Sequence, residues 1–253
     1  MIAEILQYAA TVPVTTRAHR GYIRYSVNLW SRARRCSSSW AVHEEKSRAA
    51  MLTAAAALRQ KRTVVVLGSG LLRDVPIEAL AKAFDTVVLI DLVHLASVRL
   101  WLRAKGYRNV RLIERDLSGY DDLRQTGNAE PLGFLRGVPY LDLVISANLL
   151  SQIGRGVKRR FEAEQGSAMP DDTVQRLIAA HIEGLRALPC ANCLVTDISY
   201  AVIDRTGKTH ETADLLQGVS VPQDIKASWS WPVAPLGEES RDYQIVHQVI
   251  ADY

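Results

Sequence analysis

Two glycines follow an apolar run near the middle of the sequence, and an acid ends the next such run. Gly68 and Gly70 come directly after 63-TVVVL-67, and Asp91 is the last residue of 86-TVVLID-91. A glycine lets the backbone turn tightly and approach a ligand closely. A carboxylate about twenty residues further on can accept hydrogen bonds from both hydroxyls of a ribose. The spacing therefore predicts a site for a ligand that contains a ribose.

Two more polar residues follow the next apolar runs. Asp116 ends the run 109-NVRLIERD-116, and Asn148 follows 141-LDLVISA-147. In a doubly wound sheet, ligands bind outside the carboxyl ends of the strands. An acid after the third strand can accept a hydrogen bond from an adenine amino group. The four strand ends together predict an edge of the sheet that binds adenosine.

The glycine pattern differs from the dinucleotide-binding fingerprint. That fingerprint is G-x-G-x-x-G, whereas this chain has 68-GSGLLR-73, with Arg73 in place of the third glycine. An arginine is compatible with a pyrophosphate but not with tight packing of the helix on the strand. A ligand with ribose and adenine but no pyrophosphate suits the pattern better than a nicotinamide dinucleotide does.

From residue 61 onward, short apolar runs alternate with segments of helical periodicity. This pattern predicts a parallel sheet covered on both faces, and two segments of period two near the end predict a hairpin. We expect an α/β fold with a doubly wound, mostly parallel seven-stranded sheet over 61–253, ending in an antiparallel hairpin, and an N-terminal helical cap over 1–60. The expected strands are 63–68, 86–91, 109–116, 141–147, 193–203, 226–233 and 242–250. The expected helices are 44–60, 75–84 with Asp74 as N-cap, 93–106 and 171–188, and the expected loops include 154–170 and 204–224.

At these strand ends the chain resembles the class I S-adenosylmethionine-dependent methyltransferases. The motifs that carry the resemblance are VVVLGSG, the acids of VVLIDLVH and LIERDLSG, and DLVISANLLSQI after the fourth strand. The resemblance covers roughly residues 61–253 and includes the order of the seven strands. It implies S-adenosylmethionine as the cofactor. The cofactor-binding residues that it implies are Gly68, Ser69 and Gly70 for the methionine and ribose part, Asp91 with neighbouring Leu92 for the ribose hydroxyls, Asp116 with Leu117 for adenine, and Asn148 with Leu149 facing the methyl group.

Two positions depart from the family pattern. Val66 stands where the family often has an acid, and Leu72 stands where it often has a third glycine. Asp74 is the candidate for the missing carboxylate near the methionine ammonium. Because such departures also occur in relatives that have lost activity, a binding or scaffold protein remains an alternative to a methyltransferase. A nicotinamide-dependent oxidoreductase is a third interpretation.

Two residues are candidates for catalysis or contact with the methyl acceptor, which we expect to be a small molecule. His43 lies in 36-CSSSWAVHEEKSR-48, a segment that commonly covers the cofactor in this fold, and Trp40 shares its helix face. Asp197 lies near the carboxyl end of the fifth strand, where it would face the cleft. The alternatives are core packing of Trp40 with a solvated His43, and a loop role for Asp197. Three histidines of this domain are expected to be structural, although His94 could lie near the ribose: His94, His181 and His247.

Charge and cysteine content narrow the possible partners. Six arginines lie between Arg17 and Arg35, which predicts either a solvated helical face or contact with an anionic partner such as nucleic acid.

The pair 190-CANC-193 has no second pair, so no metal is expected. No apolar run reaches the roughly 20 residues of a membrane span, and no basic region precedes the apolar N-terminus. We expect a cytoplasmic protein without membrane contact, of unknown oligomeric state.

Overall fold

The computed structural model describes residues 1–165, 169–221 and 224–253, and its strands form one eight-stranded sheet. The strand order is β3-β2-β1-β4-β5-β8-β7, with β6 paired to β5 outside this path. Strands β1 to β5 are parallel, and β8 is antiparallel to both of its neighbours. The strands are β1 Thr63–Leu67, β2 Thr86–Asp91, β3 Val110–Glu114, β4 Leu141–Ala147, β5 Ala191–Asp204, β6 Thr209–Asp214, β7 Ala227–Ala234 and β8 Tyr243–Asp252.

The central strand β1 explains why the sheet is covered on both faces. All five of its side chains are buried, and alternate residues enter two different cores. Val64 and Val66 pack in one core, whereas Val65 and Leu67 pack in the other. Because β1 to β4 run in parallel, their carboxyl ends meet at one edge, where the loop after β1 begins. This edge carries the predicted site.

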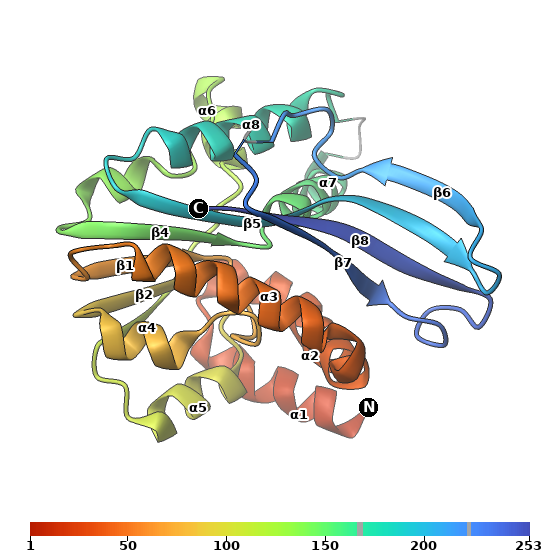
Figure 1. Cartoon of the computed structure of the whole chain (residues 1–253), viewed down its shortest axis with the longest axis horizontal. Helices are drawn as coiled ribbons and strands as arrows, with labels where there is room; N and C mark the ends of the chain where they lie inside the picture. Colours follow the sequence, from red (N-terminus) through yellow and green to blue (C-terminus); the bar gives the residue numbers. More distant parts are fainter. Residues whose placement is uncertain (166–168, 222–223) are drawn as a thin grey trace.

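The helices lie in two layers, with α1 to α5 on one face of the sheet and α6 to α8 on the other (Figure 1). Short 3-10 turns at Val12–Val14, Arg17–Tyr22 and Gly133–Gly137 connect them. The helices are α1 Ile2–Thr11, α2 Ile23–Arg35, α3 Ser37–Ala56, α4 Ile77–Ala83, α5 Ala96–Lys105, α6 Tyr120–Thr126, α7 Leu150–Gln165 and α8 Thr173–Arg186.

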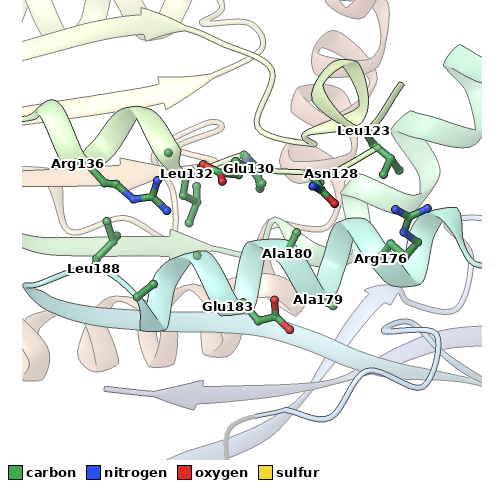
Figure 2. A pocket seen from close by; sticks show the side chains of 15 residues that line it. Leu123, Asn128, Glu130, Leu132, Arg136, Arg176, Ala179, Ala180, Glu183 and Leu188 are labelled. Carbon is green, nitrogen blue, oxygen red and sulfur yellow. Dashed lines mark hydrogen bonds and ion pairs between the residues drawn. The ribbon is translucent and has the colours of Figure 1, made fainter. Parts of the chain in front are cut away.

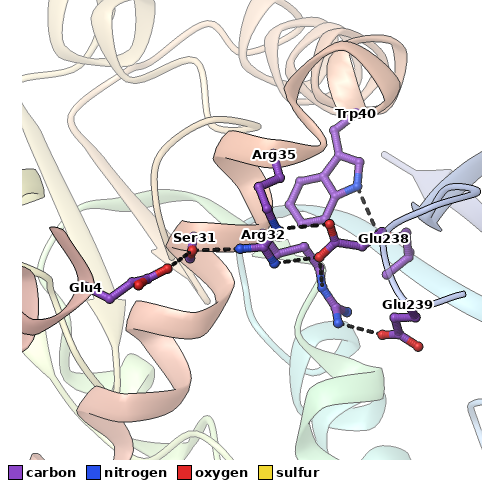
Figure 3. Close-up of polar contacts among 8 residues, drawn as sticks. Glu4, Ser31, Arg32, Arg35, Trp40, Glu238 and Glu239 are labelled. Atoms are coloured by element: carbon purple, nitrogen blue, oxygen red, sulfur yellow. Dashed lines mark hydrogen bonds and ion pairs between the residues drawn. The ribbon is translucent and has the colours of Figure 1, made fainter. Parts of the chain in front are cut away.

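The N-terminal helices are tied to the C-terminal hairpin by charged contacts (Figure 3). Arg35 Nη2 lies 2.6 Å from Glu238 Oε1, and Arg32 Nη2 lies 2.5 Å from Glu239 Oε1. The indole N–H of Trp40 donates to the Val233 carbonyl at 3.2 Å. These contacts occupy two members of the predicted arginine cluster within the molecule, so they give no support to a nucleic-acid surface there.

The predicted α/β architecture with a mostly parallel sheet, a C-terminal hairpin and N-terminal helices is confirmed, and three local predictions are wrong. Residues 154–165 are not a loop but belong to α7, while 166–168 lie outside the described residues. Helix α4 begins at Ile77, and Asp74 makes no capping contact with it. An additional strand, β6, occupies part of the expected loop 204–224. In the part of the chain that the structure describes, we find no helix with the length and apolar character needed to span a membrane.

Candidate functional site

The loop after β1 folds over the end of β2 and closes on its acid. The N–H groups of Gly68 and Ser69 both donate to the Ile90 carbonyl, at 2.9 and 3.2 Å. The Gly70 N–H donates to Asp91 Oδ2 at 2.7 Å, and the carboxylate's other oxygen accepts from the N–H of Leu92 at 2.7 Å. The predicted glycines and the predicted acid are therefore in contact. Since each carboxylate oxygen has two acceptor sites, Asp91 keeps acceptor capacity for a further ligand.

Gly68 is held in a conformation that only glycine adopts easily. Its φ is +73°, and a Cβ at this position would lie 2.9 Å from the Ala147 carbonyl oxygen and 3.2 Å from Leu149 Cβ. The loop after β1 is thus pressed against the end of β4. The close approach also fixes where the backbone of residues 68–70 lies relative to Asn148.

Replacing Gly68 by alanine should destabilise the fold by about 3 kcal/mol, combining the cost of a left-handed residue with overpacking. We expect the thermal midpoint to fall by roughly 6–12 °C. Gly207→Ala is the matched control, because Gly207 has φ +86° but nothing within 4 Å of its added Cβ. It should cost only about 1–2 kcal/mol. Equal losses in calorimetry of the two variants would contradict the tight contact between the loop and β4.

The second predicted acid, Asp116, lies just beyond β3 at the same edge of the sheet. Its Oδ1 accepts the Ser118 N–H at 2.8 Å, and Arg160 Nη1 lies 3.3 Å from its Oδ2. The adjacent Arg115 N–H donates to the Asp91 carbonyl at 2.9 Å, which places the ends of β2 and β3 side by side. Leu117 is buried in the core on the α6–α8 side. The structure brings Asp116 near the loop edge but adds an arginine from α7 that the sequence did not predict.

Asn148 connects the end of β4 with the loop after β1. Its backbone has φ +50°, and its N–H donates to the Val195 carbonyl of β5 at 2.8 Å. Its side-chain amide donates to Asp74 Oδ2 at 2.6 Å. Burial raises the pKa of Asp74, and the hydrogen bond from Asn148 opposes that shift. Asp74 therefore contacts a strand-end residue of the site.

Two polar atoms at this junction are fully buried without a partner among the described residues. They are the hydroxyl oxygen of Ser69 and the carbonyl oxygen Oδ1 of the Asn148 side chain. A buried polar atom without a hydrogen bond costs about 1–3 kcal/mol. Together with the Asp74 carboxylate they provide acceptors suited to a group with several N–H donors, such as an ammonium.

His43 reaches the same junction from α3, but its hydrogen bonds restrict its chemistry. The Trp229 indole N–H donates to His43 Nδ1 at 3.1 Å, so in the neutral ring the proton lies on Nε2. Nε2 lies 3.4 Å from Asn148 Nδ2. The ring stacks on Trp231 with centroids 3.9 Å apart and an interplanar angle of 5°. Burial lowers the pKa of His43 to about 4, despite the nearby Asp197.

The segment predicted to act as a lid is a packed helix. Trp40 and His43 share one face of α3, as predicted, and both are buried. Both also contact Trp231, and the Trp40 ring meets it edge-on at 5.2 Å. The loop after β1 is clamped to α3, because Arg73 Nε lies 2.5 Å from Glu44 Oε1. Helix α3 is fixed beside the loop after β1 by aromatic packing and this ion pair.

The second catalytic candidate, Asp197, is paired with a histidine of the neighbouring strand. His247 Nδ1 lies 2.6 Å from Asp197 Oδ2, and the two side chains are 5% and 3% exposed. Burial alone would raise the pKa of Asp197, but the hydrogen bond and charge of His247 hold it below its usual value. Asp197 Oδ1 is fully buried and has no partner among the described residues. The structure thus adds His247, which the sequence pattern assigned to the core.

Comparison with known proteins leaves the sequence family open. No protein-family model matches the chain, and no curated protein matches it. Solved structures match at low identity. The DhpI–SAM–HEP complex is 17% identical, with a TM-score of 0.39, over 87% of this chain and 78% of that chain. N-methyltransferase NodS from Bradyrhizobium japonicum WM9, in complex with S-adenosyl-L-homocysteine, is 12% identical, with a TM-score of 0.38, over 82% of this chain and 86% of that chain.

A third match is 1,6-didemethyltoxoflavin-N1-methyltransferase from Burkholderia thailandensis, at 15% identity and a TM-score of 0.34, over 87% of this chain and 86% of that chain. Likeness at this level is distant, so the fold is decided by the strand order. The order β3-β2-β1-β4-β5-β8-β7, with β8 antiparallel to its neighbours, is a doubly wound, mostly parallel sheet that ends in an antiparallel hairpin, as expected. The chain has a doubly wound α/β fold of the kind that the resemblance to class I methyltransferases implies.

Two cavities lie away from the loop after β1. One, of about 510 Å³, lies between residues 128–136 and α8 (Figure 2). The other, of about 660 Å³, is lined by β5, β6, β8 and residues 216–221. None of the predicted cofactor-binding residues lines either cavity. The contacts of Gly70 with Asp91 and of Asp74 with Asn148 thus lie outside both cavities.

Proposed function

We propose that this chain binds S-adenosylmethionine at the edge formed by the loop after β1 and transfers a methyl group to a small molecule. The observations that carry the proposal are the contact of Gly70 with Asp91 and that of Asp74 with Asn148 at the carboxyl ends of β1, β2 and β4, together with the unpartnered buried atoms Ser69 Oγ and Asn148 Oδ1. When bound, S-adenosylmethionine supplies a methyl group that its sulfonium centre activates for displacement. The protein's task is then to hold the cofactor, align the acceptor and exclude water.

The residues present fit the two halves of this cofactor. For the adenosine half, Asp91 would accept from the ribose hydroxyls, and Asp116 with Leu117 would contact the adenine. For the methionine half, the Asp74 carboxylate and Asn148 Oδ1 provide acceptors for the ammonium. The match is chemical, because an ammonium has three donors and no acceptor.

The two catalytic candidates would act on the acceptor side of the site. Asp197 lies in β5 beside Asn148, whose N–H donates to Val195 two residues earlier in that strand. His43 contacts Asn148 through Nε2. Because Trp229 occupies the lone pair of His43 Nδ1 and the ring proton lies on Nε2, neutral His43 has no free lone pair, so we assign it a packing role beside Asn148. Asp197 remains the candidate for the proton chemistry of the acceptor.

Isothermal titration calorimetry tests the cofactor assignment directly. We expect S-adenosylmethionine and S-adenosylhomocysteine to bind at micromolar concentrations and NADH not to bind. Absence of heat with either sulfur compound at millimolar concentration would overturn the proposal. Binding of NADH instead would favour the oxidoreductase interpretation. Cofactor binding without methyl transfer to any acceptor tried would point to a binding protein with this fold.

Substitution Asp74→Asn should separate the methionine half from the adenosine half. The variant loses a charged acceptor, and a hydrogen bond to a charged group contributes about 1.5–3 kcal/mol. We expect the Kd for S-adenosylhomocysteine to rise about 10- to 100-fold. 5′-Methylthioadenosine lacks the ammonium, so its affinity should not change. An equal loss for both ligands would show that Asp74 supports the loop and does not bind the amino acid.

A further inference from the structure

Asp197 and His247 form a carboxylate–imidazole pair on the face of the sheet that carries α3. They lie on adjacent antiparallel strands, where Tyr200 pairs with His247 and Asp197 pairs with Val249. Since a carboxylate only accepts hydrogen bonds, the 2.6 Å contact places the ring proton on Nδ1. The lone pair of the neutral ring then lies on Nε2. This is the tautomer that a general base requires.

The Nε2 atom of His247 keeps its lone pair, and the side chain is 5% exposed. It makes no hydrogen bond to any described residue, and it is not among the fully buried polar atoms that lack a partner. His43 on the same face differs, because its Nδ1 accepts the Trp229 indole N–H. Of these two histidines, only His247 combines a carboxylate on one nitrogen with an open lone pair on the other.

A chain of contacts links this pair to the proposed methyl-transfer site. His43 contacts Asn148 through Nε2 and stacks on Trp231 at 3.9 Å. Trp231 in turn meets the His247 ring edge-on, with centroids 5.9 Å apart. The backbone bond from Asn148 to Val195 also places the end of β4 two residues from Asp197. The pair therefore lies at the same edge as the residues proposed to face the methyl group.

We propose that His247 is the base that accepts a proton from the methyl acceptor, that Asp197 positions its ring, and that the acceptor is a phenolic hydroxyl. This inference rests on the proposed methyltransferase function. An imidazole takes a proton more readily from a phenol than from an aliphatic alcohol, because the phenol is the stronger acid. The rings of Trp231 and Tyr200 lie 5.9 and 6.0 Å from that of His247 and provide aromatic walls for such an acceptor.

The proposed methyl transfer conserves atoms and charge with these groups alone. The phenolic O–H proton moves to His247 Nε2 while the oxygen forms a bond to the methyl carbon, and the carbon–sulfur bond breaks with its electron pair left on sulfur. The products are a methyl ether, a neutral thioether and an imidazolium, whose charge Asp197 stabilises. Other charged or titratable groups near the pair are His43 of α3 and Arg155 of α7.

Two phenols that differ in acidity provide the test, with methyl transfer followed by radiolabelled S-adenosylmethionine. 4-Methylphenol is protonated in mildly alkaline buffer, whereas 4-nitrophenol is largely ionised and needs no base. In His247→Gln we expect the rate with 4-methylphenol to fall about 100-fold or more, the usual contribution of a general base. The rate with 4-nitrophenol should change less than about threefold. Asp197→Asn should show the same split, because it loses the tautomer that the carboxylate selects.

The controls separate this inference from the proposed function. His210→Gln alters an exposed histidine outside the site and should match the unaltered protein with both phenols. The affinity for S-adenosylhomocysteine and the urea midpoint should be retained in His247→Gln, which excludes misfolding as the cause of a lost rate. If the cofactor binds but His247→Gln slows both phenols equally or neither, His247 is not the base. If the cofactor binds and neither phenol is methylated, the phenolic assignment is overturned. If the cofactor does not bind, the proposed function itself fails.

Discussion

The substitution Asp91→Ala should reduce affinity for S-adenosylhomocysteine at least about 100-fold. The carboxylate would lose its bonds to both ribose hydroxyls, and each hydrogen bond to a charged group contributes about 1.5–3 kcal/mol. A loss near 3 kcal/mol corresponds to about 100-fold in Kd. The effect should be larger still, because Asp91 also holds the loop through the N–H groups of Gly70 and Leu92. Calorimetric titration of the variant measures it.

The control and a second ligand sharpen this expectation. Asp242→Ala removes a carboxylate that is 87% exposed in the turn between β7 and β8, so it should bind S-adenosylhomocysteine like the unaltered protein. 5′-Methylthioadenosine retains the ribose, so Asp91→Ala should weaken its binding, in contrast to Asp74→Asn. Unchanged affinity of Asp91→Ala for both ligands would place the adenosine elsewhere on the molecule.

The strands near this site could be predicted closely from the sequence. Strand β1 spans Thr63–Leu67 where 63–68 was expected, and β2 matches its expected range of 86–91. A parallel strand covered by helices on both faces must be apolar at every position, so it reads as an unbroken run of β-branched residues. The polar or glycine residues at the strand end are then those that directly follow the apolar run.

Helix α7 was missed because local composition and tertiary packing disagree there. Its sequence contains Gly154 and Gly156 and many charges, and a glycine inside a helix costs about 1 kcal/mol. Yet Ile153, Val157 and Phe161 recur every four residues, and all three are buried against the core on that side. Burial of this stripe outweighs the weak intrinsic propensity. The helix also supplies Arg160 to Asp116, a contact that an expected loop could not reveal.

Strand β6 and the start of α4 were not predicted correctly from the sequence, for a different reason. Strand β6, THETAD, is mostly exposed and has no apolar alternation, because it forms an edge paired only with β5. Asp74 reads as a helix cap, a common role for aspartate, but its carboxylate instead accepts from Asn148. Whether the Asp74 carboxylate accepts from a nearby helix N-terminus or from Asn148 depends on the tertiary structure.

The pairing of Asp197 with His247 could not be read from spacing either. Fifty residues separate the two, and the bulge in β5 next to Asp197 sets which residues of β8 lie beside it. The sequence placed His247 on an inward-facing side of its strand, which is correct, and from that pattern a core role was the simplest reading. Only the register of the antiparallel pair shows that an acid meets it.

Stability should fall steeply between about pH 6.5 and pH 4, because His43 and His181 are among the histidines buried in neutral form. Burial lowers the pKa of His43 and of His181 to about 4, from an ordinary value of 6.5. In this window the unfolded chain binds more protons than the folded one, so the free energy of unfolding decreases as the pH is lowered. Relative to neutral pH, each ring should lower the free energy of unfolding by about 2 kcal/mol at pH 5 and by about 3 kcal/mol near pH 4. For both together this is a large part of the 5–15 kcal/mol of a typical domain.

Urea unfolding at pH 7.5 and pH 5 measures the effect, and a matched pair of variants assigns it. His181 Nε2 lies 3.0 Å from the Ser146 hydroxyl inside the core on the α6–α8 side. His181→Gln removes one titrating ring, so the difference in unfolding free energy between the two pH values should shrink by about 2 kcal/mol. Ser146→Ala removes the same hydrogen bond but no titrating group, so it should lower stability equally at both values. Because the proton linkage belongs to the ring and not to the bond, an undiminished pH dependence in His181→Gln would show that this histidine is not the buried neutral group described here.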